Sequence, residues 1–357
     1  MKKKILLTPL GLLLAISLVA MGFAAQPVIA LPKRLTFATH SVGTILHASG
    51  SGLAKVASEH SGMLVVVSPT AGPTAWVPLM NTSGNPEIGI ISGADAWQAY
   101  TGKLAPAPLS PGDSRTKAPY EPNPNLRLLM MGTRLKVCIL VRADSPIKVP
   151  EDLRGKRVTW GFPAFPPLQV SGMAMLRNAG LTIKDVEPVV VPEVKAGVQA
   201  LVDGRLDAAL CAMGMPIITE ANAKVGVRIL PALTDREALK RTQEVMAATT
   251  IERVAPGPAG VKVETPLLGT SLNVIASLHM PDEVAYTLVK AWWDYHKELW
   301  PIHRQLKGWV PGLFIHESVP IPYHPGAIKF YKEKGVWTAE QDKWQDILLK
   351  GELPSLK

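Results

Sequence analysis

Short β-type runs alternate with runs of helical periodicity along most of this chain. A first series contains candidate strands at 34–39, 63–67 and 87–92, and a second series follows a strand at 137–141. Helical spacing of apolar residues separates the strands. Because neighbouring parallel strands need a crossover connection, which is usually a helix, the alternation predicts an α/β fold with a parallel sheet covered by helices.

The length and the hydrophobic content predict two domains or two lobes. The chain has 357 residues, of which 47% are hydrophobic, so it can bury a sizeable core and is not disordered. One domain usually holds about 100–200 residues. The proline-rich segment 105–124 lacks periodicity, and we expect a long loop there between the two series.

The N-terminus has the layout of a secretory signal. Lys2, Lys3 and Lys4 precede an uncharged apolar run over 5–25, and small residues follow it. We therefore predict a cleaved signal peptide at 1–30 and a periplasmic protein, with an uncleaved membrane anchor as the alternative. Because 1–30 contains no acidic residue, removing its three lysines lowers the formal charge from +9 to +6.

The remaining charge does not indicate a nucleic-acid partner, because the lysines and arginines are spread singly and form no stripe that matches phosphates. Cys138 and Cys211 are too few for a four-thiolate metal site. Both lie in predicted strands, where either buried thiols or a single disulfide would fit. We expect no nucleic acid, no metal and no cofactor.

Catalytic patterns are weak. His40, Ser41 and Asp95 are the residue types of a hydrolytic triad, but no nucleophile-elbow pattern surrounds Ser41. We therefore expect a binding protein rather than an enzyme. A secreted enzyme is the alternative, and it would need an acid–base pair in its cleft.

The loops that follow the predicted strands are the candidate ligand sites. In open α/β sheets, ligands bind beyond the carboxyl ends of the strands, where helix N-termini present free N–H groups. Helix capping is the commoner use of Ser and Thr in such loops, and it is the alternative at each position. The candidate ligand-binding residues are His40, Ser41, Thr44, Thr70, Gly72, Thr74, Ser92, Asp95, Phe162, Phe165, Gln169 and Met213.

Four passages have distinctive sequences. Residues 35–44 open the mature chain, 152–158 read Asp-Leu-Arg-Gly-Lys-Arg-Val, 203–208 contain Gly-Arg-Leu-Asp-Ala, and 321–336 contain Pro-Tyr-His-Pro-Gly-Ala. In this order they resemble the substrate-binding proteins of tripartite ATP-independent periplasmic (TRAP) transporters, specifically the TAXI group. The last passage is the most specific, and the resemblance covers essentially the whole mature chain.

The resemblance implies a two-lobed type II periplasmic binding protein fold with crossing hinge strands. Lobe 1 would comprise 33–139 plus 266–357, and lobe 2 would comprise 140–265. The chain would leave lobe 1 along 137–141 and return near 265–276. The two lobes would close around one small organic acid, and the loaded protein would dock on the TRAP membrane permease. We expect a monomer.

Departures from the family pattern bear on the ligand. The second-lobe loop, which is rich in Gly, Ser and Thr in the family, reads Phe-Pro-Ala-Phe-Pro-Pro over 162–167. The loop at 71–74 reads Ala-Gly-Pro-Thr where the family tends to have Gly-Gly-Ser. These changes favour a carboxylate with an apolar or aromatic body. The alternative is that the Phe and Pro side chains pack the loop against its own lobe.

Overall fold

The computed structural model describes residues 30–109, 117–163, 166–316 and 319–353. Phe165 and all but the last residue of the expected signal peptide at 1–30 lie outside these ranges. Within these ranges no helix is long and apolar enough to cross a membrane.

The first βα series forms where the sequence predicts it. It comprises β1 (Arg34–Thr39), α1 (Ile45–His60), β2 (Leu64–Pro69), η1 (Pro73–Ala75), α2 (Val77–Ser83), β3 (Ile88–Ser92) and α3 (Gly93–Thr101). β1 lies between β2 and β3 and pairs with both in parallel, because helical segments connect these strands. α1 packs against β1 and β2 through buried apolar residues such as Leu53 and Val56.

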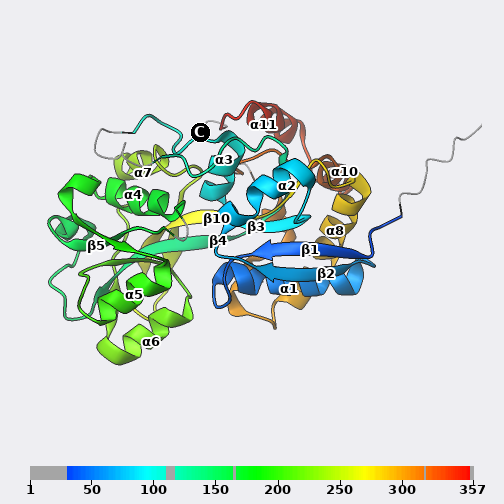
Figure 1. The fold of residues 1–357 in the computed structure, drawn as a ribbon. Helices are drawn as coiled ribbons and strands as arrows, with labels where there is room; N and C mark the ends of the chain where they lie inside the picture. Colours follow the sequence, from blue (N-terminus) through cyan, green and yellow to red (C-terminus); the bar gives the residue numbers. More distant parts are fainter. Residues whose placement is uncertain (1–29, 110–116, 164–165, 317–318, 354–357) are drawn as a thin grey trace, which may run out of the picture. The chain divides into compact units, whose positions relative to one another are not determined.

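Two long strands cross the middle of the fold, β4 (Leu126–Arg142) and β10 (Thr265–Ser277) (Figure 1). They pair antiparallel with each other, and β10 also pairs antiparallel with β3. The main sheet is therefore mixed, with the order β2-β1-β3-β10-β4-β7, and not wholly parallel. The chain leaves along β4 and returns along β10, so these two strands run in opposite directions. β4 is also longer than the predicted 137–141, because a polar stretch interrupts its hydrophobic pattern.

The second series follows β4. It comprises η2 (Pro150–Leu153), β5 (Arg157–Gly161), α4 (Leu168–Asn178), η3 (Ile183–Asp185), β6 (Glu187–Val191), α5 (Val194–Val202), β7 (Ala209–Ala212), α6 (Pro216–Val225), β8 (Val227–Ile229), α7 (Arg236–Gln243) and β9 (Thr250–Val254). β5 and β6 form a separate parallel pair. β7 and β8 pair with β4, and β9 pairs with β10, all antiparallel.

The C-terminal part is helical. It comprises α8 (Asp282–Asp294), η4 (His296–Leu299), η5 (Arg304–Gly308), α9 (Pro311–Phe314), α10 (Pro325–Glu333) and α11 (Ala339–Leu349). α8 ends at Asp294 and is followed by the short η4. α8 packs against α1 and α10, which returns this part of the chain to the first series.

Buried apolar side chains form two cores, one for each series. Along β4, Met131 belongs to the first core and Val137 to the second, and Leu135 packs against both. Along β10, Leu268 belongs to the second core and Leu272 to the first. The crossing strands thus connect the two cores (Figure 1). The predicted lobe boundaries at 139/140 and 265/266 stay a prediction.

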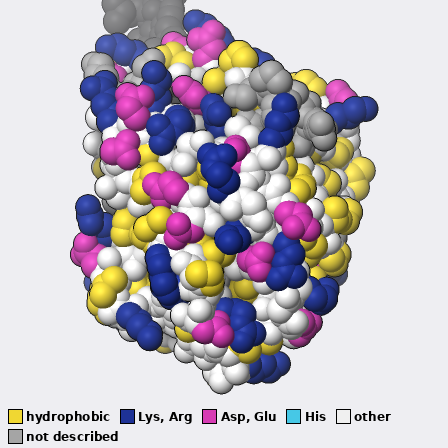
Figure 2. Space-filling model, turned by 90° about the vertical axis from the view of Figure 1, so that its left-hand side faces the viewer, with side chains coloured by type: hydrophobic (Ala, Val, Ile, Leu, Met, Phe, Trp, Pro, Cys, Tyr) yellow, Lys and Arg dark blue, Asp and Glu magenta, His cyan; other side chains and the backbone are white. Residues whose placement is uncertain are grey.

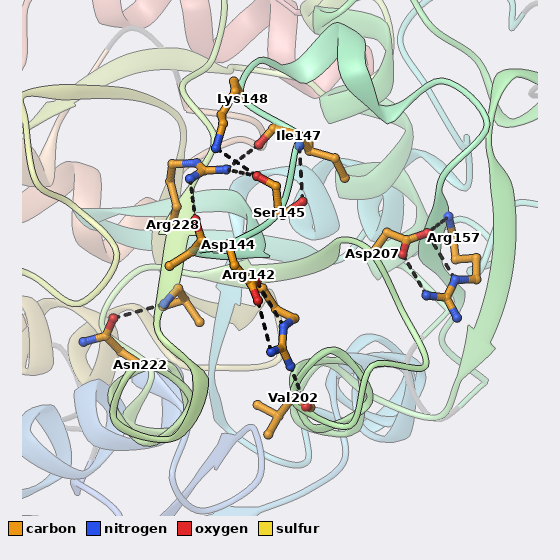
Figure 3. Close-up of polar contacts among 12 residues, drawn as sticks. Arg142, Asp144, Ser145, Ile147, Lys148, Arg157, Val202, Asp207, Asn222 and Arg228 are labelled. Carbon is orange, nitrogen blue, oxygen red and sulfur yellow. Dashed lines mark hydrogen bonds and ion pairs between the residues drawn. The ribbon is translucent and has the colours of Figure 1, made fainter.

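Two of the distinctive passages are held together by an ion pair at the start of the second core (Figure 3). Arg157 donates from Nε and Nη2 to the Asp207 carboxylate at 3.1 and 2.7 Å, and its backbone N–H donates to the same carboxylate at 2.8 Å. Close by, the Arg228 side chain donates to the carbonyl groups of Ala143 and Ile147. The Arg157–Asp207 pair fastens β5 to the segment that leads into β7, and Arg228 fastens β8 to the loop after β4, so their role is structural.

The C-terminal passage also has a structural role. His324 accepts a hydrogen bond at Nδ1 from the Gly326 N–H at 3.1 Å, and its Nε2 donates to the Met280 carbonyl at 3.1 Å. A Cβ atom on Gly326 would lie 2.1 Å from the Asp282 carbonyl oxygen, so only glycine permits this approach. The passage thereby fastens the start of α10 to the start of α8.

Charges of both signs are interspersed on the face of the molecule that carries the second series. Figure 2 shows this face, where Lys and Arg side chains alternate with Asp and Glu side chains. A nucleic-acid-binding surface would instead concentrate positive charge in a patch or stripe. That the chain binds no nucleic acid stays a prediction.

Candidate functional site

A cavity of about 120 Å³ lies where the two cores meet, and we call it the first cavity. Residues of both series and of the crossing strands line it. They are His40, Ser41, Thr44, Ile45, Leu46, Ala71, Ser92, Asp95, Leu135, Val137, Leu168, Ser171, Glu193, Val194, Lys195, Leu210, Cys211, Ala212, Met215 and Thr270.

The N-termini of five helices reach the first cavity. α1 and α3 come from the first series, and α4, α5 and α6 come from the second. Each helix follows the carboxyl end of a strand, namely β1, β3, β5, β6 and β7. Helix N-termini present N–H groups without intrahelical partners and the positive end of the helix dipole. Their convergence makes the first cavity suitable for a negatively charged group.

The two sides of the first cavity differ in how these helices are capped. The Thr44 hydroxyl accepts from the His47 N–H at 3.1 Å, and the Ser92 hydroxyl accepts from the Asp95 N–H at 3.2 Å. The helix-capping interpretation is therefore confirmed for Thr44 and Ser92, although both also line the first cavity. By contrast, α4, α5 and α6 have no side-chain cap. Their N-termini are not satisfied by a capping side chain and can serve a ligand.

The walls of the first cavity are mainly apolar. Ile45 and Leu46 contribute from α1, Leu135 and Val137 from β4, and Leu210 from β7. Hydroxyl groups from both sides interrupt these walls. Mostly apolar lining with a few placed polar groups is typical of small-molecule sites.

Burial sets the charge on the first-series wall. Asp95 is 7% exposed, and this burial raises its pKa to about 7, although the Ser92 hydroxyl donates to the carboxylate at 2.8 Å and opposes the rise. Burial lowers the pKa of His40 to about 4, so this side chain is neutral at pH 7. On the opposite wall, the exposed Lys195 and Glu193 lie at the start of α5. The strongest fixed positive charge at the first cavity is thus that of Lys195.

Five of the predicted ligand-binding residues line the first cavity: His40, Ser41, Thr44, Ser92 and Asp95. All lie at the carboxyl ends of β1 and β3 or at the starts of the helices that follow.

The residues predicted from the loop after β2 are not in this lining. The Thr70 hydroxyl donates to the Thr39 carbonyl at 2.8 Å, which ties the ends of β1 and β2 together. Gly72 and Thr74 lie at η1, and from this loop only Ala71 reaches the first cavity. Ser41 is tied to the same loop, because its hydroxyl donates to the Thr70 carbonyl at 3.2 Å.

The residues predicted from the second series also lie elsewhere. Phe162 is fully buried within the second core, so the packing alternative describes its position. The Gln169 side chain donates from Nε2 to the Gly161 carbonyl at 2.7 Å. Met213 lines a different cavity, and Phe165 lies outside the described residues.

Sequence reasoning missed the start of α5. Residues 193–195 follow β6 at its carboxyl end, so they obey the same rule that selected the other loops. They contain no glycine or hydroxyl residue, so they lack the residue types that indicate the other candidate loops. Their position directly after β6 is the sequence feature that indicates them.

Comparison with known proteins shows the family of this chain and structures with a similar fold. The sequence profile of the NMT1-like family matches residues 37–335. The chain belongs to the NMT1-like family. Among solved structures, the periplasmic binding protein BugD is similar with a TM-score of 0.51 and 14% sequence identity, over 90% of this chain and 97% of BugD.

Two further structures are similar at a lower level. PhnD1 from Prochlorococcus marinus in complex with methylphosphonate has a TM-score of 0.48 and 13% identity, over 85% of this chain and 99% of PhnD1. The periplasmic aliphatic sulphonate binding protein SsuA from Escherichia coli has a TM-score of 0.43 and 14% identity, over 90% and 86%. At 14% identity the likeness to BugD concerns the fold. Together with the two cores that the crossing strands connect, it confirms the predicted two-lobed periplasmic binding protein fold for this member of the NMT1-like family.

Proposed function

We propose that this protein is a periplasmic solute-binding protein that captures a small organic acid with an apolar or aromatic body in the first cavity. The main observation in support is that five helix N-termini from both series meet at a cavity with mainly apolar walls. N–H groups and helix dipoles favour a carboxylate, and the apolar walls favour a hydrocarbon body. The solute-binding fold of the related structures supports the same function.

The uncapped helices suggest how the solute is oriented. The carboxylate would face the N-termini of α4, α5 and α6, because the N–H groups of these helix starts have no side-chain cap. The ammonium group of Lys195 would lie beside it. The apolar body would contact Leu135, Val137 and Leu210. Asp95 on the opposite wall would then lie away from the carboxylate, which reduces but does not remove the repulsion when Asp95 is ionised.

Because the first cavity takes its lining from both cores, the solute completes an interface between them. A ligand that contacts both parts binds preferentially to the arrangement in which they are close, and it shifts the population toward that arrangement. We propose that the loaded form then delivers the solute, as a monomer, to a TRAP-type membrane permease of the kind that the TAXI resemblance implies. The distinctive passages at 35–44 and 321–336 support this assignment.

A thermal-shift screen of small carboxylates, including aromatic ones, tests the proposal. At a hundredfold excess over its dissociation constant, the solute should stabilise the protein by about 2.7 kcal/mol. Lys195→Gln should reduce the shift while leaving the melting temperature of the free protein unchanged, since Lys195 is exposed. Lys184→Gln, which removes an exposed lysine from η3, is the matched control and should keep the full shift.

Two results would overturn the proposal. One is the absence of a shift with any carboxylate, and the other is an equal loss of the shift in both lysine variants. Recovery of the solute after prolonged incubation separates binding from catalysis. A binding protein returns the solute unchanged, whereas conversion to a product would favour the secreted-enzyme alternative.

A further inference from the structure

A second and larger cavity, of about 580 Å³, lies on the other face of the crossing strands. Lys136 lines it, whereas its neighbours Leu135 and Val137 on β4 line the first cavity. Successive side chains of a strand point to opposite faces. The two cavities are therefore on opposite sides of β4, and an occupant of one does not fill the other.

The second cavity is strongly basic. Lys136, Arg253, His303 and Lys307 line it, and none of the described lining residues is acidic. Among these four side chains and within the described residues, only Arg253 pairs with a carboxylate, that of Glu264 at 3.0 Å.

The two lysines are the uncompensated charges. Within the described ranges, neither Lys136 nor Lys307 has a carboxylate within 4.0 Å. The nearest acidic side chain on β9, Glu252, is engaged by Arg134 at 3.4 Å. Lys136 is half-buried, so its charge is incompletely solvated and favours a counter-ion.

Uncharged hydrogen-bond donors also line the second cavity. The His303 Nδ1 atom accepts from the Gln305 N–H at 3.2 Å, so it carries no proton in the neutral ring. The proton of the neutral imidazole is then on Nε2, which makes that atom a donor. The Gln305 side chain also lines the second cavity and adds amide hydrogens.

Both cores contribute to the second cavity. His303 and Gln305 belong to the segment that continues into Leu306 and Trp309 of the first core, whereas Met213 belongs to the second core. An occupant would therefore touch both parts of the molecule, as the solute in the first cavity does.

We propose that the second cavity binds a small molecule with at least two negative charges, carried by carboxylate or phosphoryl groups. A molecule with two negative charges pairs with both lysines at once, whereas a single carboxylate would leave one of them without an ion-pair partner in the second cavity. The volume falls within the range of about 300–1,000 Å³ that is usual for metabolite-sized ligands. This ligand differs from the monoacid proposed for the first cavity, which has one fixed cation.

Isothermal titration calorimetry at low ionic strength tests the site, with citrate and pyrophosphate as probes and acetate as the monovalent control. The wild-type protein should bind one citrate or pyrophosphate and should bind acetate at least about tenfold more weakly. Lys136→Gln/Lys307→Gln should weaken binding of the polyvalent probes at least about tenfold. Lys103→Gln/Lys184→Gln removes the same charge from exposed positions elsewhere and should bind like the wild type.

The single variant Lys307→Gln keeps the test valid if the double variant folds poorly, because Lys307 is exposed and its loss should weaken binding on its own. Stronger binding of citrate than of pyrophosphate would identify carboxylates as the natural groups, and the reverse order would identify phosphoryl groups. The proposal is overturned if no polyvalent probe binds at millimolar concentration. It is also overturned if both double variants lose affinity equally. Neither outcome affects the thermal shift by monocarboxylates, which depends on the first cavity.

Discussion

The carboxyl group of Asp95 should make the stability of the protein depend on pH in a predictable direction. Burial raises its pKa from 3.8 to about 7. One pKa unit corresponds to about 1.36 kcal/mol, so the folded protein disfavours the ionised carboxylate by about 4 kcal/mol. A folded-state pKa above the unfolded value gives a contribution that is fully present below pH 3.8 and is lost as the pH rises through about 7.

Asp95→Asn removes this titration and keeps an oxygen that can accept from the Ser92 hydroxyl. Between pH 5 and pH 8 the wild type should lose about 3 kcal/mol of unfolding free energy relative to the variant. At roughly 2 °C per kcal/mol for a chain of this size, its melting temperature should fall by about 6 °C relative to that of the variant. His40 titrates in both proteins, so its effect cancels in the difference.

Urea unfolding of both proteins at pH 5, 6, 7 and 8 measures this difference. Asp346→Asn removes an exposed carboxylate from α11 and is the control, whose difference from the wild type should stay within about 0.5 kcal/mol at each pH. If the difference in unfolding free energy between the wild type and Asp95→Asn stays constant from pH 5 to pH 8, the pKa of Asp95 is not raised by burial.

Three further predictions follow from the same contacts. Affinity for a monocarboxylate should fall from pH 6 to pH 8 in the wild type but stay level in Asp95→Asn, as measured by calorimetry, because Asp95 gains a negative charge over this range and repels the ligand across the first cavity. Phe162→Ala should lower the unfolding free energy by about 3–5 kcal/mol in urea titrations, because Phe162 is fully buried in the second core; an effect below about 1 kcal/mol would contradict that packing. Cys138 and Cys211 should react with iodoacetamide far more slowly in the native protein than in urea, because both are buried and the pKa of Cys211 is raised well above its ordinary value. Rapid alkylation of the native protein would show that the thiols are accessible.

The βα pattern was predictable because strands and helices differ in hydrophobic period. β1 and β3 lie within a residue of the predicted strands at 34–39 and 87–92, since each is a short run of strand-forming residues. The first half of β4 was missed because it reads Leu-Arg-Leu-Leu-Met-Met, in which no strict alternation distinguishes a strand from a helix. The antiparallel pairing of β4 and β10 depends on contacts between residues more than a hundred positions apart, which local periodicity does not encode.

The candidate site was predictable on the side where strand ends are marked by hydroxyl residues. Thr44 and Ser92 cap helices and also line the first cavity, so the hydroxyl groups that stabilise the helix starts also indicate this side of the candidate site. On the other side the helix starts are uncapped and carry Val, Lys and Met, which have no turn or capping signature. For Phe162 the sequence leaves two positions open, because an aromatic residue in a loop can fill the core beneath it as well as a ligand site, and the structure buries it in the second core.

Native mass spectrometry of the freshly purified protein shows whether the solute occupies the first cavity. Ala212→Phe places a ring into the first cavity, and Ala223→Phe places the same ring on the exposed surface of α6 as a control. After titration with the best carboxylate from the screen, the wild type and Ala223→Phe should each carry one bound acid, and Ala212→Phe should carry none while remaining folded by circular dichroism. Equal occupancy in a folded Ala212→Phe protein would show that the acid binds outside the first cavity and would contradict the account.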